Sequence, residues 1–428
     1  MQEKEEIRSL SLVSPVWSRS TNLIATHGEG CYLYDPEGTA YLDFTSGIGV
    51  TNLGHCHPNV VEAVRRQAGQ LLHGQANIVW HEAMLELVAE LLSLTPPSLN
   101  RFFFSNSGAE AVEGALKLAR MATGRTNIIV FQGGFHGRTI GTMSLTTSKT
   151  IYRGHYQPLM AGVFVTPYPY AFRYGWDPEQ TSRWCLDELR FLLATQTAPE
   201  ETVGVIVEPV LGEGGYVVPP RDFLQGVRQI CDEFDLLLIV DEIQSGIGRT
   251  GHWFAHEHFN VMPDIMTLAK GLASGLPLSA VVASGELMDQ WKPGSHGGTF
   301  GGNAVACAAA NATLQTMKQE NVLFNTEARG EELMKGLRDL QQNHPRIGDV
   351  RGLGLMVGVE FRNEEGSPDE SFTKKVLKGC YDHRLLLLSC GPWNNTIRFI
   401  PPLIVSKSQI DDALDIFEMA LKSAEAQV

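Results

Sequence analysis

Between residues 61 and 305, short apolar runs alternate with stretches in which apolar residues recur at helical spacing. Residues 61–72 and 83–94 show the helical spacing, whereas residues 127–131 form an apolar run of strand length. Strands that alternate with amphipathic helices build a mainly parallel sheet whose two faces are both buried. The pattern therefore predicts an α/β fold with a large domain built around such a sheet.

The N-terminal segment contains two short features. Residues 31–34 and 41–44 alternate apolar and polar side chains around Asp35-Pro36-Glu37-Gly38, which predicts a hairpin. Further on, His55-Cys56-His57 allows two interpretations, a metal tripod or a structural turn closed by Pro58. Consecutive residues in an extended stretch point their side chains to opposite sides, which disfavours shared metal ligands. We expect the turn and no metal.

The C-terminal part has a different pattern from the central region. After Gly302 come long helical stretches, then strand candidates at residues 385–389 and 396–399 and a terminal helix from Gln409. These features predict a smaller α+β domain. We therefore divide the chain into three parts: an N-terminal segment that packs with the small domain (1–60), a large domain (61–305) and a C-terminal small domain (306–428).

Composition excludes several classes of function. The chain has 428 residues and a formal net charge of −14, which disfavours nucleic acid as a partner because duplex binding needs clustered Lys and Arg. No stretch approaches the roughly 20 apolar residues of a membrane span, and residues 1–6 are polar and acidic, unlike a signal peptide. The seven cysteines form no CxxC pair. We expect a cytoplasmic protein with reduced thiols.

Polar clusters follow four of the apolar runs at the point where each run ends. Asn106-Ser107-Gly108 follows residues 101–105, and Gly133-Gly134-Phe135-His136 follows residues 127–131. In the same way, Glu208 follows the run at 203–207 and Asp241 follows the run at 236–240. Because ligands of open α/β sheets bind beyond the carboxyl ends of the strands, we expect these clusters to converge on one crevice.

The first cluster precedes a predicted helix, residues 111–120. Backbone N–H groups of Ser107, Gly108 and Ala109 would lie at its N-terminus, where unpaired donors and the helix dipole favour a phosphate. An ordinary serine N-cap explains the same residues equally simply. Taken alone, the cluster therefore leaves both interpretations open.

Asp241 and Glu242 stand at the end of the most apolar run in the chain. A carboxylate in this position should be partly desolvated, so it needs a cationic partner, and a protonated pyridine nitrogen would be one. The glycines at residues 246–251 and 133–138 do not match the phosphate loop of nucleotide hydrolases, which requires G-x-x-x-x-G-K-[ST].

Lys270 ends a further strand-like run, 263–269, and lies 29 residues after Asp241. A lysine at the inner end of a strand loses hydration, so its pKa falls and its neutral amine becomes available to form an imine. The alternative is a lysine that extends to the surface, which its neighbours Leu268, Ala269 and Gly271 disfavour.

These motifs resemble the class III aminotransferases of the ornithine and 4-aminobutyrate type, a branch of the fold-type-I pyridoxal-phosphate enzymes. The likeness begins at Asp43-Phe44-Thr45-Ser46-Gly47-Ile48 and ends at Ile397-Arg398-Phe399-Ile400-Pro401-Pro402. Its most specific part is the combination of DEIQSGIGRTG, which starts at Asp241, with the lysine in Ala269-Lys270-Gly271. The resemblance implies the fold-type-I architecture, with a mainly parallel seven-stranded sheet.

The resemblance also implies roles in holding pyridoxal 5'-phosphate. Lys270 would be the Schiff-base lysine and the proton shuttle, and Asp241 would keep the pyridine nitrogen protonated. The other implied cofactor contacts are Ser107, Gly108 and Ala109 at the phosphate, Thr299 of the neighbouring subunit also at the phosphate, Gln244 at the ring hydroxyl, Phe135 and Ile243 on the two ring faces, and His136 and Glu208. A contribution from Thr299 implies a homodimer or a dimer of dimers.

For substrates, the resemblance implies an amino donor and a keto-acid acceptor, commonly 2-oxoglutarate, that react in turn. Arg138 would bind a distal carboxylate and Arg398 an α-carboxylate. Glu213 would pair with Arg398 when the donor lacks an α-carboxylate. Ile48 stands where ornithine aminotransferases have tyrosine, and Cys390-Gly391, residues 397–402 and Tyr168-Pro169-Tyr170 look more like the 4-aminobutyrate group.

Several alternatives remain at this point. The donor can be of the acetylornithine, ornithine or broad amine type, and some close relatives of the family are amino-acid racemases built on the same lysine and aspartate. A cofactor-sensing regulator is disfavoured, since such proteins generally carry a DNA-binding appendage and this chain has no spare basic domain.

Overall fold

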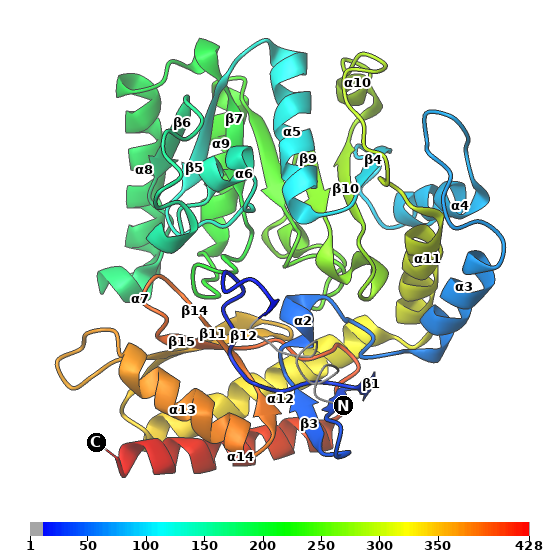
Figure 1. Ribbon diagram of the computed structural model, residues 1–428. Coiled ribbons are helices and arrows are strands. Elements are labelled where there is room, and N and C mark those ends of the chain that lie inside the picture. The colour runs from blue at the N-terminus through cyan, green and yellow to red at the C-terminus, as the bar shows by residue number, and fades with distance from the viewer. Residues whose placement is uncertain (1–11, 428) are drawn as a thin grey trace.

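The structure, a computed structural model, describes residues 12–427 and contains one large and two small sheets (Figure 1). The polar start at residues 1–6, on which the signal-peptide argument rests, lies outside the described residues. Within the part of the chain that is described, no helix combines the length and apolar composition needed to cross a membrane.

The large sheet has seven strands and lies in the upper half of Figure 1. Only β10 in this sheet runs antiparallel to its neighbours, so the sheet is mainly parallel, as predicted. In spatial order the strands are β4 (Arg101–Ser105), β10 (Ser279–Ala283), β9 (Ile265–Leu268), β8 (Leu237–Asp241), β7 (Thr202–Val207), β5 (Asn127–Phe131) and β6 (Val163–Thr166). The α/β fold class is therefore confirmed.

The strands are apolar along their whole length because helices cover both faces of the sheet. All six residues of β7 are buried, which an alternating sequence could not achieve. Side chains of α5 (Gly108–Thr123) and α6 (Ile140–Leu145) pack on one face, and those of α8 (Pro178–Thr195) and α9 (Arg221–Glu233) pack on the other. Polar side chains can thus leave the sheet only at strand ends.

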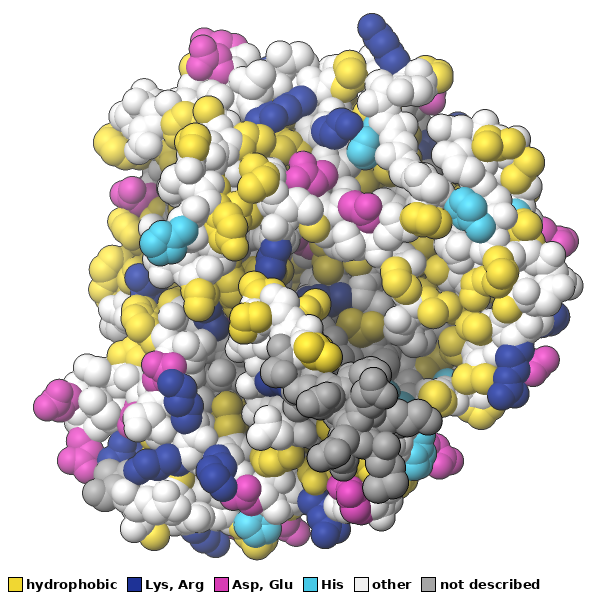
Figure 2. Space-filling view, viewed as in Figure 1, with side chains coloured by type: hydrophobic (Ala, Val, Ile, Leu, Met, Phe, Trp, Pro, Cys, Tyr) yellow, Lys and Arg dark blue, Asp and Glu magenta, His cyan; other side chains and the backbone are white. Residues whose placement is uncertain are grey.

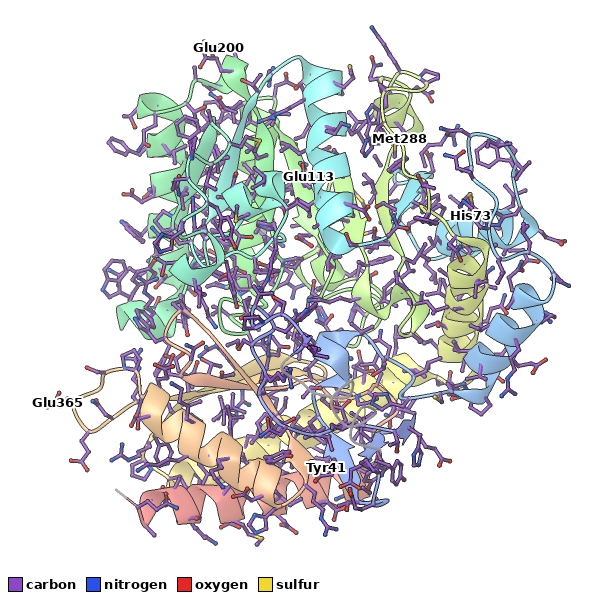
Figure 3. The ribbon with its side chains drawn as sticks, in the orientation of Figure 1. Tyr41, His73, Glu113, Glu200, Met288 and Glu365 are labelled. Carbon is purple, nitrogen blue, oxygen red and sulfur yellow. The ribbon has the colours of Figure 1, made fainter. Side chains whose placement is uncertain are left out.

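Two four-stranded sheets occupy the lower half of Figure 1. The first contains β1 (His27–Glu29), β2 (Tyr32–Tyr34), β3 (Ala40–Asp43) and β13 (Leu385–Leu386), in that order. The second has the order β11 (Ile347–Leu353), β12 (Met356–Phe361), β15 (Thr396–Phe399) and β14 (Leu388–Cys390). Tyr41 lies in the first of these sheets, whereas Glu200 marks the opposite end of the molecule (Figure 3).

The predicted strand at residues 385–389 is wrong as a single element. β13 pairs in parallel with β3, and β14 pairs antiparallel with β15, so the two halves of the run belong to different sheets. The apolar run is continuous in the sequence and does not indicate where it divides. The division depends on the strand with which each half forms hydrogen bonds. The predicted hairpin is confirmed as β2 and β3.

The long helices frame the molecule at its side and base. The α3, α4 and α11 helices pack against one another at the side, and α13 packs on α14 beneath the second small sheet (Figure 1). Their bounds are α3 (Pro58–Ala68), α4 (Glu82–Leu92), α11 (Ala304–Gln319), α12 (Val322–Asn343), α13 (Glu370–Asp382) and α14 (Lys407–Glu425). The terminal helix begins two residues before the predicted Gln409, because Gln409 forms a capping box with Ser406.

Short helices connect these elements. The segment at residues 166–176, which is rich in Pro and Tyr, contains the helix α7 (Ala171–Tyr174). The others are α2 (Ser46–Gly49), α10 (Gly285–Met288), η2 (Thr150–Tyr152), η3 (Pro199–Glu201), η4 (Ala255–Phe259) and η5 (Lys270–Ala273). The division into residues 1–60, 61–305 and 306–428 remains our proposal for the domain boundaries.

Arg249 ties three distant segments together from a fully buried position. Its guanidinium donates to the carbonyl oxygens of Leu355 (3.1 Å) and Pro401 (2.5 Å) and to Oδ1 of Asn52 (3.0 Å). In return, the Leu355 N–H donates to the Arg249 carbonyl oxygen at 3.1 Å. These bonds connect the loop after β8 with the N-terminal segment and both sides of the C-terminal sheet.

We expect Arg249→Ala to lower the melting temperature by several degrees. The substitution leaves buried acceptors without donors, which costs about 3 kcal/mol or more in total. Thermal unfolding of the variant should be compared with Arg183→Ala, which removes an exposed arginine in a surface helix pair. Equal melting temperatures for the two variants would contradict a structural role for Arg249.

Candidate active site

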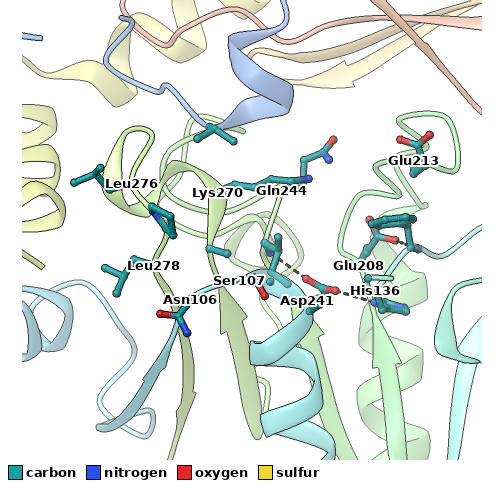
Figure 4. Close-up of a pocket in the computed structure, with 18 of the residues that line it drawn as sticks. Asn106, Ser107, His136, Glu208, Glu213, Asp241, Gln244, Lys270, Leu276 and Leu278 are labelled. Atoms are coloured by element: carbon teal, nitrogen blue, oxygen red, sulfur yellow. Dashed lines mark hydrogen bonds and ion pairs between the residues drawn. The ribbon is translucent and has the colours of Figure 1, made fainter. Parts of the chain in front are cut away.

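A cavity of about 330 Å³ opens at the carboxyl edge of the large sheet (Figure 4). The space-filling view shows the molecule hollowed between its upper and lower halves, with basic side chains inside the hollow (Figure 2). Eleven of the residues predicted for the site line this cavity: Ser107, Gly108, Ala109, Phe135, His136, Glu208, Glu213, Asp241, Ile243, Gln244 and Lys270. The expected convergence of the four strand-end clusters is thus observed.

Lys270 follows β9 after one intervening residue and starts η5 with a φ of +38°. A left-handed backbone at a residue with a side chain costs about 1 kcal/mol or more, so surrounding packing must impose it. Within the described residues its amine makes neither a hydrogen bond nor an ion pair. Burial, aided by the positive charge of Arg398, lowers the pKa of Lys270 to about 8. The amine is therefore available as a base or nucleophile near neutral pH.

Asp241 is the last residue of β8 and is almost completely buried. Its Oδ2 lies 2.7 Å from Nδ1 of His136, while Oδ1 accepts from the Ile243 N–H at 3.1 Å and from Oγ1 of Thr267 at 3.3 Å. Burial opposes a charge on His136, but Asp241 and Glu208 together raise its pKa above the usual value. Thr267 of the neighbouring strand β9 thus holds Asp241 on one side, and the cavity lies on the other side.

Glu208 occupies the end of the neighbouring strand β7. Its carboxylate accepts from the Phe135 N–H at 2.8 Å and from the Gly212 N–H at 2.9 Å, which fixes the loops after β5 and β7 relative to each other. Burial raises the pKa of Glu208 to about 7, although the charge of His136 opposes the shift. The carboxylate therefore acts as a joint between two loops that line the cavity.

The N-terminus of α5 points its first turn at the cavity. The Ser107 hydroxyl accepts from the Glu110 N–H at 3.3 Å, so the capping interpretation is confirmed. The N–H groups of Gly108 and Ala109 have no acceptor within the helix, which leaves them suited to an anion. A Cβ on Gly108 would lie 2.9 Å from Cδ1 of Ile243, so only glycine permits this close approach.

Gln244 provides the clearest sign of a missing polar partner. Its Oε1 is buried and has no hydrogen-bond partner in the part of the chain that is described. Buried amide oxygens are rarely left unpaired, so this atom favours a polar group of a ligand in the cavity. Phe135 and Ile243 line the same cavity and supply its apolar surfaces.

The predicted substrate residues lie around the cavity, and only Glu213 lines it. Arg398 is buried on β15 and donates through a terminal nitrogen to Glu213 Oε2 at 2.9 Å. Ile48, Arg138 and Thr299 are exposed and do not line the cavity in the single chain.

Some residues around the site were not predicted from the sequence. Val50 and Leu276 line the cavity, and both belong to loops without any strand-end signal. Lys149 and Tyr152 contact Glu213 from a segment more than sixty positions away, at 3.3 Å and 2.8 Å. No spacing in the sequence predicts these contacts, because they depend on how separate loops pack against each other.

The two histidines of the turn before Pro58 have separate partners. Nε2 of His55 lies 2.9 Å from Asp43, whereas Nε2 of His57 lies 3.4 Å from Glu320, and Pro58 starts α3. This arrangement supports the structural turn.

A family comparison decides the class of enzyme, since the model of the class-III aminotransferases matches residues 13–421. This chain is a class III aminotransferase. Enzymes of this class depend on pyridoxal 5'-phosphate, so the predicted cofactor is confirmed.

Individual relatives and structures agree with this class III aminotransferase along its whole length. A probable 4-aminobutyrate aminotransferase of Bacillus subtilis is 38% identical over 96% of this chain and 95% of the relative. An acetylornithine aminotransferase of Caldanaerobacter subterraneus is 41% identical over 93% and 94%. An alanine/serine racemase of Pyrococcus horikoshii is 37% identical over 94% and 86%. The PLP-bound amine transaminase of an uncultivated Pseudomonas species has a TM-score of 0.92 at 28% identity, covering 97% and 99%.

The lowered pKa of Lys270 predicts how the cofactor-free aminotransferase takes up pyridoxal phosphate. The amine is neutral above its pKa of about 8, whereas an ordinary lysine has a pKa of 10.5. Only the neutral amine attacks an aldehyde, so the rate of uptake should rise with pH up to about 8 and then level off. Absorbance measures the rate, and Lys270→Ala should lose the borohydride-reducible bond. A rate that keeps rising as for an ordinary lysine would contradict the assignment.

Proposed function

We propose that this enzyme transfers the amino group of an ω-amino acid such as 4-aminobutyrate to 2-oxoglutarate in two successive half-reactions. The observation that carries the proposal is the pairing of Arg398 with Glu213 beside the cavity at 2.9 Å. An arginine neutralised by a carboxylate leaves room for a donor that has no α-carboxylate. The names of the Bacillus subtilis and Caldanaerobacter relatives support a donor with an amine far from a carboxylate.

The residues around the cavity fit pyridoxal phosphate. The phosphate would bind the first-turn N–H groups of α5 at Ser107, Gly108 and Ala109, and the unpaired Gln244 Oε1 would meet the ring hydroxyl. Asp241 would bind the protonated ring nitrogen, held in place by His136. Phe135 and Ile243 would contact the two faces of the ring. When bound, the cofactor supplies an aldehyde for the amine and a ring that withdraws electrons from the donor carbon that bears the amine.

Lys270 performs the proton transfer in this proposal. Its amine would hold the aldehyde until a donor displaces it, and the free amine would then take the proton from the donor carbon that bears the amino group, which is C4 in 4-aminobutyrate. Its lowered pKa of about 8 suits both roles, because a much larger share of the amine is neutral near pH 7 than for an ordinary lysine. The same amine then returns the proton one atom further along, at the carbon that belonged to the aldehyde.

Arg138 and Arg398 would select substrates by their carboxylates. Arg138 is exposed and makes no ion pair in the described part of the chain, so its guanidinium is free to bind the distal carboxylate of the donor. Arg398 would bind the α-carboxylate of glutamate or 2-oxoglutarate after Glu213 has moved away. Ile48, beside this position, would contact the aliphatic part of the donor.

The proposal is tested by adding 4-aminobutyrate, glutamate or ornithine to the purified enzyme without any acceptor. Each productive donor should remove the absorbance band of the lysine-bound cofactor and produce the band of pyridoxamine phosphate. We expect 4-aminobutyrate and glutamate to do so, and ornithine to react more slowly because Ile48 cannot hydrogen-bond its α-amine. A band that persists with all three donors would reject the proposed substrates.

Racemisation is a second candidate, which the Pyrococcus horikoshii relative favours. A racemase removes and returns the Cα proton without net amino transfer, so its cofactor band would persist. Loss of optical rotation from an amino acid such as alanine, with an unchanged cofactor band, would assign this reaction.

We also propose that two copies of the chain assemble as a homodimer with shared sites. Exposed apolar side chains gather beside Thr299, namely Leu72 (65% exposed), Ile78 (80%), Trp80 (70%) and Phe300 (60%). Hydrophobic side chains also cover the neighbouring α3 and α4 side in Figure 2, and the ring of His73, labelled in Figure 3, lies 5.3 Å from that of Phe300 in a tilted arrangement. A patch of this kind favours a subunit interface, which would carry Thr299 towards the partner's phosphate.

Subunit mixing tests this assembly. Lys270→Ala and Thr299→Glu should each inactivate the enzyme, the second by placing a negative charge near the phosphate. After mixing and reassembly, about a quarter of the sites should combine an intact lysine with an intact threonine, and activity should return. No recovery from subunits that exchange, as judged by light scattering and tagged-subunit capture, would contradict a shared site.

A further inference from the structure

The two oxygens of the Glu213 carboxylate have different partners. Oε2 accepts from Arg398 at 2.9 Å. Oε1 accepts from the Tyr152 hydroxyl at 2.8 Å and from Nζ of Lys149 at 3.3 Å. Glu213 can therefore lose its contact with Arg398 and still keep two hydrogen bonds, both on the other oxygen.

The groups on the Oε1 side are fixed independently of Arg398. Lys149 also donates to Oδ1 of Asn394 at 2.6 Å, which holds its amine at the edge of the C-terminal sheet. The Gly391 N–H donates to the Glu213 carbonyl oxygen at 2.9 Å, so the backbone of Glu213 is anchored while its side chain can rotate. Burial, with the charge of Glu213, raises the pKa of Tyr152, which keeps its hydroxyl a donor.

Without another partner for Glu213, separating this carboxylate from Arg398 would be energetically unfavourable. Burial opposes the charge of Glu213, but Arg398 and Lys149 together lower its pKa, so the group is a carboxylate at neutral pH. A buried carboxylate that loses its only partner is strongly destabilised. Lys149 provides a second cation beside Arg398. When a substrate brings an α-carboxylate, Arg398 can bind that group and Lys149 can bind Glu213.

We propose that Lys149 and Tyr152 form a second holding site for Glu213, which lets this carboxylate release Arg398 when a substrate brings an α-carboxylate. The inference rests on the proposed function, in which Arg398 binds that group. Lys149 and Tyr152 are positioning residues in this scheme, since they act through Glu213. Tyr152 also lies against Arg138, whose guanidinium carbon is 4.4 Å from the ring centroid, so Tyr152 contacts Arg138 directly and is linked to Arg398 through Glu213.

Binding of unreactive acids to the cofactor-loaded enzyme tests this site without catalysis. Glutarate has two carboxylates and requires Glu213 to leave Arg398, whereas butyrate has one and leaves the pair closed. We expect Tyr152→Phe, which keeps the ring on Arg138, and Lys149→Met each to weaken glutarate about fivefold by calorimetry. Butyrate affinity should change less than about twofold. Equal changes for the two acids, or tighter glutarate binding, would overturn the second holding site.

Two further variants separate this inference from the proposed function. Tyr156→Phe removes a hydroxyl from an exposed tyrosine of the same segment and should leave both affinities unchanged. Glu213→Gln should strengthen glutarate relative to butyrate, because Arg398 loses its competing carboxylate. If Glu213→Gln behaves so but Tyr152→Phe and Lys149→Met do not, the second holding site is wrong and the proposed pairing stands. If Glu213→Gln leaves the ratio unchanged, both fail.

Discussion

Burial of the large parallel sheet on both faces is the constraint on which the rest of this structure depends. Helices cover each face, so strands such as β7 contain no exposed side chain and polar groups can only emerge beyond the strand ends. Because six of the strands run in one direction, their carboxyl ends meet at one edge. The cavity, with its acids and its lysine, lies along that edge.

Within the cavity, the pKa or hydrogen bonding of each ionisable group depends on the low dielectric around it and on a particular neighbour. Lys270 has no hydrogen-bond partner in the described residues, and its pKa is lowered to about 8. Asp241, in contrast, raises the pKa of His136. The Glu208 carboxylate accepts hydrogen bonds from two backbone N–H groups. A lysine with a lowered pKa and a supported carboxylate therefore lie within one small space, as transamination requires.

A second electrostatic centre lies between the large sheet and the C-terminal sheet. Glu213 comes from the loop after β7, and Arg398 comes from β15, so their ion pair joins the two halves of the molecule. Lys149 adds a third charge from another loop. In the proposed function, substrate recognition and the packing of the two halves would be coupled here, because the same side chains would serve both.

The sequence by itself determined the fold class, the ends of some strands and the candidate residues for chemistry there. Apolar runs and helical spacing are local properties, so β4 and β5 have the bounds that the sequence indicates, and Lys270 and Asp241 could be chosen from their positions after such runs. Only the tertiary structure decided which backbone pairs with which: residues 385–390 divide between two sheets. It also decided that Tyr152 and Lys149 meet Glu213, since contacts between loops far apart in the chain depend on packing that no local pattern records.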